Sequence, residues 1–221
     1  MDAITVKELF DLTHTAAADY LSAFNYPWEA LKGIGALIRE LIPKLPTEEY
    51  TCLGNEIYVH KSVRIPATAS LSGPCIIGEG TEVRPGAFIR GSVLVGKGAV
   101  VGNSCELKNC ILFDEVQVPH FNYVGDSILG YKAHMGAGAV TSNVKGDKKP
   151  VVVHGEQNYE TGLPKFGAIL GDFAEIGCNS VLNPGTIIGK DSQVYPLSSV
   201  RGVVPARSIY KSERGIFSKK P

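Results

Sequence analysis

Apolar residues recur at every sixth position along much of this 221-residue chain. One run of ten begins at Val59, and a second run of six begins at Leu170. An amphipathic helix has a period of 3.6 residues, so a helix does not explain this spacing. The apolar members of the two runs are Val59, Ile65, Leu71, Ile77, Val83, Ile89, Val95, Val101, Leu107 and Phe113, and then Leu170, Ile176, Leu182, Ile188, Val194 and Val200.

This six-residue period is typical of a hexapeptide parallel β-helix, in which short strands stack in successive coils. Small or β-branched residues follow most of the apolar residues by four positions, and the chain is rich in glycine, as a narrow interior with frequent turns requires. Three hexads complete one triangular coil, so residues 18 apart are expected to lie one above another. The sequence therefore predicts an all-β parallel β-helix over residues 51–210.

Three segments do not share the period. Residues 1–50 read as helical, with apolar residues at helical spacing between Pro27 and Pro43. We expect them to form a short N-terminal cap over the open first coil; the alternative is a docking surface for another protein. Residues 143–168 are a long excursion from the β-helix, and such loops are usually functional. Residues 211–221 form a C-terminal tail.

The composition disfavours several classes of protein. Basic and acidic residues are equal at 22 each, whereas a sequence-independent nucleic-acid binder needs a basic excess. No stretch approaches the roughly 20 apolar residues of a membrane span, and the N-terminal sequence lacks the order of a signal peptide. We therefore expect no nucleic-acid or membrane partner and a cytoplasmic location. The five cysteines form no Cys-x-x-Cys, which disfavours both a disulfide framework and a zinc site.

Polar residues gather where the register of the hexads breaks. Among them His120 is the candidate general base, because an imidazole titrates near neutral pH and can take a proton from an amine that attacks a thioester. Its position alone also allows a surface or structural histidine.

The string of residues 118–130, followed by the Gly-Ala-Gly of residues 136–138 and by Asn143, resembles a known family. It is similar to the acetyltransferase half of the bifunctional N-acetylglucosamine-1-phosphate uridyltransferase/glucosamine-1-phosphate acetyltransferase. It is still more similar to that half of the archaeal sugar-1-phosphate nucleotidylyltransferases that also acetylate amino-sugar 1-phosphates. The resemblance covers about residues 75–205, and residues 26–29 resemble the segment between the halves. Nothing resembles the nucleotidyltransferase half, so we expect no nucleotidyl transfer.

The resemblance implies a left-handed β-helix that forms a homotrimer with active sites between subunits. It implies transfer of an acetyl group from acetyl-coenzyme A to an amino-sugar 1-phosphate resembling glucosamine 1-phosphate, with no metal required. His120 matches the catalytic base of the family. The residues implied in substrate binding are Arg90, Lys108, Tyr123, Asn143, Lys149 and Lys165.

Two of these cationic contacts have alternatives. Arg90 lies 18 residues before Lys108, so the coil arithmetic stacks the two. Arg84 sits in an Arg-Pro-Gly-Ala string that resembles the family's phosphate arginine, but it is displaced by one hexad. Lys149 fits the archaeal pattern and Lys165 fits the bacterial one.

The C-terminal coils are the expected place for acetyl-coenzyme A. Small residues there are expected to leave room for the pantetheine arm along a groove, namely Ala174, Ser180 and Ser198. Four basic residues lie near the C-terminus: Arg201, Arg207, Lys211 and Arg214. They either pair with coenzyme A phosphates or form a solvated face, and the solvated face is the preferred interpretation. Arg201 is kept as a candidate for cofactor binding.

Two other functions compete with acetyl transfer. His134 stands where the bacterial enzymes carry asparagine, which favours a non-catalytic oligomerising or regulatory hexapeptide protein related to sugar nucleotidyltransferases. A γ-type carbonic anhydrase needs three histidines on zinc. The chain has no His-x-x-x-x-His, so this third possibility is disfavoured.

Overall fold

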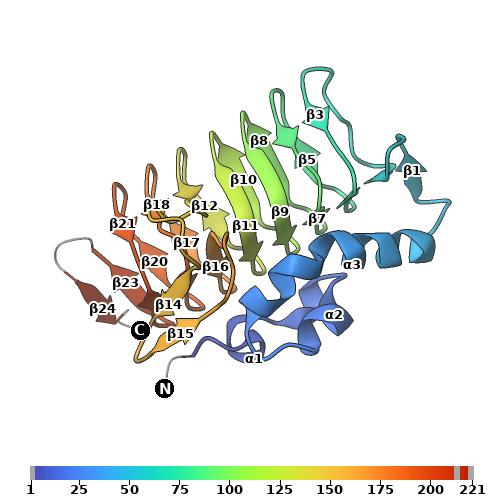
Figure 1. Ribbon diagram of the computed structural model, residues 1–221. Helices are drawn as coiled ribbons and strands as arrows, with labels where there is room; N and C mark the ends of the chain where they lie inside the picture. The colour runs from blue at the N-terminus through green and yellow to red at the C-terminus, as the bar shows by residue number, and fades with distance from the viewer. Residues whose placement is uncertain (1–2, 212–214, 219–221) are drawn as a thin grey trace.

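The computed structural model of the chain describes residues 3–211 and 215–218. Its short strands stack in successive coils along one axis, and nearly all neighbouring strands are parallel (Figure 1). This arrangement confirms the predicted parallel β-helix.

The strands of the complete coils form three faces, with one strand from each coil on each face. The first face contains β2 (Ile57–His60), β4 (Cys75–Ile77), β7 (Val93–Val95), the second halves of β9 (Glu106–Leu112) and β11 (Tyr123–Leu129), β16 (Ala168–Leu170), β19 (Thr186–Ile188) and β22 (Val203–Val204). The second face contains β5 (Glu82–Val83), β8 (Val100–Asn103), β10 (Gln117–His120), β12 (His134–Met135), β17 (Glu175–Ile176), β20 (Gln193–Val194) and β23 (Ser208–Tyr210). The third face contains β3 (Ser70–Leu71), β6 (Phe88–Ile89), the first halves of β9 and β11, β13 (Val140–Thr141), β18 (Val181–Leu182) and β21 (Ser199–Val200).

Antiparallel strands occur at both ends of the β-helix and in the excursion. The strand β1 (Tyr50–Cys52) pairs with β2 at the first coil, and β24 (Ile216–Ser218) pairs with β23 at the last. The excursion contains a hairpin of β14 (Val152–His154) and β15 (Asn158–Glu160). β1 therefore covers the edge strand of the first face, which protects the backbone of β2 from pairing with another chain.

Two coils are one residue shorter than the period predicts. Cys110 pairs with Val93, and Ser127 pairs with Cys110, so both offsets are 17 residues instead of 18. The interior position expected for Phe113 is consequently filled by Leu112, and the expectation that Phe113 continues the interior column is wrong. Phe113 is buried against Phe10 of the N-terminal segment instead, with 4.9 Å between the ring centroids.

Both short coils lack their residue at the same corner, where the third face turns into the first. We call it the third corner and define it by residues 90–92, 108–109 and 125–126. The turn at residues 90–92 has two residues with positive φ, Gly91 and Ser92, whereas each shorter turn has one, Asn109 or Asp126. Asparagine and aspartate tolerate this backbone conformation better than most residues. The short turns therefore place an amide and a carboxylate one above the other.

The N-terminal helices lie along the side of the β-helix and do not cover its first coil (Figure 1). They begin with α1 (Val6–Leu9), and the stripe expected between Pro27 and Pro43 is divided between a 3₁₀ helix and α3. The helical elements are α1, η1 (Leu12–His14), α2 (Ala18–Ser22), η2 (Pro27–Gly33), α3 (Ile34–Leu41) and η3 (Ile42–Lys44). The prediction of a cap over the open coil is therefore wrong in its placement.

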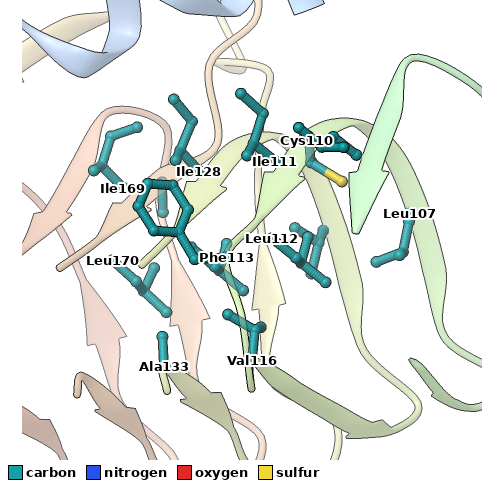
Figure 2. Close-up of a cluster of buried hydrophobic side chains, with 14 of the residues drawn as sticks. Leu107, Cys110, Ile111, Leu112, Phe113, Val116, Ile128, Ala133, Ile169 and Leu170 are labelled. Atoms are coloured by element: carbon teal, nitrogen blue, oxygen red, sulfur yellow. The ribbon is translucent and has the colours of Figure 1, made fainter. Parts of the chain in front are cut away.

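The physical reason is a second apolar row on the first face. Each of its central strands carries an outward apolar side chain as well as inward ones, and these outward residues are buried. Figure 2 shows Ile111, Ile128 and Ile169 in one row on the side toward the helices, whereas Leu112 and Leu170 point into the coil. Helices that cover this row remove far more apolar surface from water than a cap on a single coil would.

A buried carboxylate fastens the start of the chain to the coils. Asp172 accepts hydrogen bonds from the backbone N–H groups of Asp11 (2.7 Å) and Tyr131 (2.9 Å), and its Oδ2 lies 3.0 Å from Nζ of Lys190. The backbone N–H of Asp172 donates to the carbonyl oxygen of Leu9. Both carboxylate oxygens of Asp172 thus have partners, and together they link the N-terminal segment to the coils.

Close approach of neighbouring coils makes Gly102 a sensitive position. A Cβ at Gly102 would lie 1.7 Å from the carbonyl oxygen of Pro119, which belongs to the next coil. We expect Gly102→Ala to lower the free energy of unfolding by about 3 kcal/mol, because the backbones of two coils must separate. Gly146 has no atom within 4 Å of a built Cβ, so Gly146→Ala should change stability by no more than about 0.5 kcal/mol. Urea denaturation followed by circular dichroism measures both, and equal losses would contradict the coil contact.

Candidate functional site

A buried carboxylate is the centre of the polar cluster at the third corner. Asp126 is 6% exposed, and its two carboxylate oxygens accept hydrogen bonds from the side-chain amides of Asn109 (2.9 Å) and Asn143 (2.5 Å). Nζ of Lys108 lies 4.0 Å from Oδ2 of Asp126. The two amides and the ammonium group together compensate for the burial of this carboxylate.

Tyr123 extends the cluster across the third face. Its phenol oxygen accepts a hydrogen bond from Nδ2 of Asn143 (3.2 Å), and the ring lies over Gly125, where any Cβ would meet the phenol oxygen at 2.4 Å. Burial is the main cause that raises the pKa of the Tyr123 phenol, and the carboxylates of Asp126 and Glu106 raise it further. The phenol therefore stays neutral near physiological pH and can donate a hydrogen bond.

A hollow of about 350 Å³ beside Asp126 has two cationic side chains on its wall. Arg90 and Lys108 stack in adjacent coils, because β6 pairs with β9 at an offset of 18 residues, as the sequence arithmetic predicts. Arg90 also donates to Glu106 (2.6 Å), whereas the carboxylate that Lys108 meets among the described residues is that of Asp126, at 4.0 Å. This combination of stacked cations and polar side chains is suited to bind an anion.

A second hollow, of about 260 Å³, adjoins the first and shares Asn109 and Asp126 with it. Its wall also includes Lys165 from the end of the excursion and Lys32 from η2. The backbone N–H of Phe166, next to Lys165, donates to the carbonyl oxygen of Asn143 (3.0 Å). Of the two alternative lysines, Lys165 is thus the one that the fold brings to the cluster.

Lys149 and Arg84 lie elsewhere. Lys149 is exposed in the excursion, where its backbone N–H donates to Asp147, and it lines neither hollow. Arg84 pairs with Glu82 on the second face and reaches the carbonyl oxygen of Pro119 at 3.4 Å. Arg84 is therefore a neighbour of the His120 turn, not of the stacked pair.

His120 occupies the corner between the second and third faces, three residues before Tyr123. Its side chain is exposed, and its backbone N–H donates to Oδ1 of Asn122 (3.1 Å). Asn122 is 2% exposed and donates to the carbonyl oxygens of Gly136 and Ala139 in the next coil. A fully satisfied interior amide thus holds the turn that presents His120 to solvent.

The predictions for acetyl-coenzyme A need a correction. The side chains of Ala174, Ser180 and Ser198 are buried inside the coils, and both serine hydroxyls donate to the carbonyl oxygen of Tyr195. Their small size fits the narrow interior, so these side chains do not line an external groove. Arg201 is exposed.

The other basic residues near the C-terminus are described by their exposure and contacts. Arg207 is exposed, and the ammonium group of Lys211 lies over the ring of Tyr195, 5.1 Å from its centroid. Arg214 lies outside the described residues.

His134 is paired with a carboxylate on the second face. Its Nδ1 lies 2.7 Å from Oε2 of Glu175, and both residues line a hollow of about 330 Å³ with Lys132 and Glu115. Its pairing partner in the previous coil is Gln117, three residues before His120. His134 therefore occupies a different column of the coil from the proposed base.

Sequence reasoning missed three members of the cluster. Asp126 lies within the recognised string, and Asn109 follows Lys108, yet neither was assigned a role. The signal was the 17-residue spacing between Asn109 and Asp126, which places them in one column once the coils are known to be short. Lys32 has no comparable signal, because its position depends on how the helices pack.

No group of three or more His, Cys, Asp or Glu side chains within residues 3–211 and 215–218 is arranged to hold a metal ion. Over the same residues, no helix has both the length and the apolar character needed to cross a membrane.

Comparison with known proteins shows that the chain is similar to part of several bifunctional proteins. Residues 71–158 match the family model described as the GMPPB C-terminal domain. The chain is 29% identical over 220 residues to the bifunctional protein GlmU of Methanococcus maripaludis. The matched region covers 91% of this chain and 50% of GlmU. It is 28% identical over 164 residues to the bifunctional sugar-1-phosphate nucleotidylyltransferase/acetyltransferase of Sulfurisphaera tokodaii, covering 65% of this chain and 41% of that protein.

The predicted resemblance is confirmed. The chain spans about half the length of the curated relatives it matches. Among solved structures, a UDP-N-acetylglucosamine acyltransferase from Campylobacter jejuni is similar, with 14% identity and a TM-score of 0.41 over 71% of this chain and 72% of that one.

The Asp126 cluster makes a testable claim about stability. Asp126→Asn keeps the size and the tolerance for positive φ, but it removes the charge that faces Lys108 and leaves fewer acceptors for Asn109 and Asn143. We expect a loss of about 2 kcal/mol in the free energy of unfolding, measured by urea denaturation. The exposed Asp147, paired with Lys145, is the matched control, and Asp147→Asn should leave the midpoint unchanged. A midpoint for Asp126→Asn equal to that of the control would show that the cluster is not a structural centre.

Proposed function

We propose that this protein is an acetyl-coenzyme A-dependent N-acetyltransferase that acts on an amino-sugar 1-phosphate. The observation that carries the proposal is the Asp126 cluster, which brings together Lys108, Tyr123 and Asn143, all of which the family resemblance implies in substrate binding. The resemblance to GlmU supports the same conclusion.

Lys108 and Arg90 bind the phosphate of the acceptor in this proposal. Lys108 supplies the less compensated charge, and Arg90 exchanges part of its contact with Glu106 for the phosphate. Tyr123 and Asn143 then form hydrogen bonds with the sugar on the third face. In this orientation the sugar amine points toward His120, which lies three residues before Tyr123. Fixed orientation of this kind supplies a large part of the rate in group transfer.

His120 acts as the general base. It takes a proton from the attacking amine as the nitrogen adds to the thioester carbonyl, and the coenzyme A thiolate then leaves and is protonated. Acetyl-coenzyme A, when bound, supplies the thioester. Of the four residues predicted to bind the cofactor, Ala174, Ser180 and Ser198 are buried, and Arg201 is exposed and can meet its phosphates.

A homotrimer with shared active sites fits the second corner, between the second and third faces. Phe121 follows His120 and is 60% exposed, and Leu197 at the same corner, three coils further on, is 76% exposed. In this proposal a neighbouring copy covers both side chains, which removes their apolar surface from water. A neighbouring copy packed on this corner would place each His120 at a seam between chains.

A non-catalytic oligomerising or regulatory module is the second candidate. The observation that favours it is the pair of His134 and Glu175, because a histidine engaged with a carboxylate stands where the bacterial enzymes carry asparagine. Acetyl transfer assays separate the two candidates.

The catalytic claim is tested at His120. We expect the wild-type protein to release thiol from acetyl-coenzyme A with a hexosamine phosphate from a panel of glucosamine and galactosamine 1-phosphates. His120→Ala should lower kcat by about 10² to 10⁴-fold, because the general base is lost. His154→Ala changes another exposed histidine, which contacts Asn158, and should leave kcat unchanged. Unchanged release in His120→Ala refutes the base, and no release by the wild type favours the non-catalytic module.

The trimer is tested at Leu197. This residue has a positive φ, which aspartate tolerates at least as well as leucine, so Leu197→Asp should leave the coil intact while burying a charge in any contact between copies. We expect light scattering after size exclusion to show a trimer for the wild type and a monomer for Leu197→Asp. Leu53 is 52% exposed near the first coil, and Leu53→Asp should remain a trimer. A monomeric wild type would exclude the shared sites.

A further inference from the structure

The hydrogen bonds of the Asn143 side chain have a direction that the Asp126 carboxylate determines. Nδ2 of Asn143 donates to Oδ2 of Asp126 (2.5 Å) and to the phenol oxygen of Tyr123 (3.2 Å). A carboxylate only accepts hydrogen bonds, whereas an amide has one end that donates and one that accepts. If the Asn143 amide were reversed, its oxygen would face the carboxylate, and two acceptors would meet without a proton between them. Asp126 therefore fixes which end of the amide faces it.

Asp126 and Asn143 are each held by contacts of their own. Oδ1 of Asp126 accepts from Nδ2 of Asn109 (2.9 Å), and the same nitrogen donates to the carbonyl oxygen of Leu31 (3.2 Å). The backbone carbonyl oxygen of Asn143 accepts from the N–H of Phe166 (3.0 Å). The carboxylate is thus fixed to the helices and the backbone of Asn143 to the end of the excursion, independently of the contact between their side chains.

The fixed direction leaves two groups of opposite kind for a ligand. Both N–H bonds of the Asn143 amide are used, so its Oδ1 remains and can only accept. The phenol oxygen of Tyr123 already accepts from Asn143, so its O–H remains to donate. Within the part of the chain that the structure describes, neither group has a further hydrogen-bond partner. Both residues are half-buried, so a ligand can reach these groups.

We propose that Asp126 is a positioning residue of the acceptor site, which fixes the Asn143 side chain as a hydrogen-bond acceptor and the Tyr123 phenol as a hydrogen-bond donor toward the amino-sugar phosphate. This inference rests on the proposed function. Asp126 acts through these two side chains, because its own carboxylate oxygens are already occupied by Asn109 and Asn143. The phenol then donates to an oxygen of the sugar phosphate, and the amide oxygen accepts from a hydroxyl or amine of the sugar.

A double-mutant cycle on the binding of glucosamine 1-phosphate or galactosamine 1-phosphate, whichever binds more tightly, tests this role without catalysis. We expect Tyr123→Phe to weaken binding about tenfold in titration calorimetry, because the donor is lost. In Asp126→Asn the Asn143 amide can reverse and accept the phenol proton itself, so Tyr123→Phe should weaken binding by no more than about twofold. In the control background Asp147→Asn, Tyr123→Phe should again weaken binding about tenfold. A role of Asp126 in stability alone leaves this factor the same in all folded backgrounds, and that result overturns the proposal.

A swapped variant covers the case in which Asp126→Asn folds poorly. Asp126→Asn combined with Asn143→Asp keeps one carboxylate and one amide in contact, so we expect a higher urea midpoint than for Asp126→Asn alone. The direction of the hydrogen bonds is reversed, since a carboxylate at position 143 accepts from the phenol and uses its proton. Tyr123→Phe should therefore weaken binding by no more than about twofold in this background. A tenfold loss in the swapped variant overturns the proposal.

The outcomes separate this inference from the proposed function. Thiol release by the wild type, together with an equal Tyr123→Phe factor in all backgrounds, overturns the role of Asp126 and leaves acetyl transfer standing. The expected factors without thiol release from acetyl-coenzyme A overturn acetyl transfer and support the role of Asp126 in binding. Failure of the wild type to bind either hexosamine 1-phosphate overturns both.

Discussion

The structure depends on one geometric constraint: neighbouring coils must stay in register while one corner loses a residue. At the third corner, the coil that contains Gly91 and Ser92 turns with two residues of positive φ, whereas the next two coils turn with one, Asn109 or Asp126. The interior columns remain filled, since Leu112 replaces the residue that a strict period would place there. The cost of the shorter turn falls on the corner, where a positive φ selects asparagine and aspartate. The same backbone requirement therefore supplies the polar groups of the candidate site.

Burial of the Asp126 carboxylate decides what surrounds it. A charge that is 6% exposed needs hydrogen bonds and an opposite charge, and it obtains them from Asn109 in the coil before, Asn143 at the start of the excursion and Lys108 beside it. These partners come from parts of the chain that the coil period alone does not connect. The carboxylate thus joins the coil wall to the excursion, and Asn109 joins both to the helices through Leu31.

The hexad period was sufficient to predict the coils and the stacking of Arg90 on Lys108, because both follow from strand pairing at fixed offsets. It misplaced Phe113, since a one-residue deletion in a turn is invisible until the pairing is known. It could not distinguish a small interior residue such as Ser180 from a small groove residue, because both positions select for size alone. The prediction misplaced the helices because an apolar stripe on a helix does not indicate which surface it packs against. The outward row that begins at Ile76 and Leu94 on the first face was the available signal for that partner.

Packing of the N-terminal helices also determines which residues line the second hollow. The helices cover the outward apolar row of the first face, and burial of that row is a gain they would not obtain at the end of the coils. Once the helices lie along the side, η2 reaches the third corner and Lys32 enters a hollow whose other walls are the turn at Asn109 and the end of the excursion. The placement of this charge is therefore a consequence of hydrophobic burial elsewhere, and no rearrangement is needed to bring it to the corner. A coil without the covering row would have the same stacked Arg90 and Lys108 but would lack Lys32, which separates the part of the site that belongs to the repeat from the part that the N-terminal helices add.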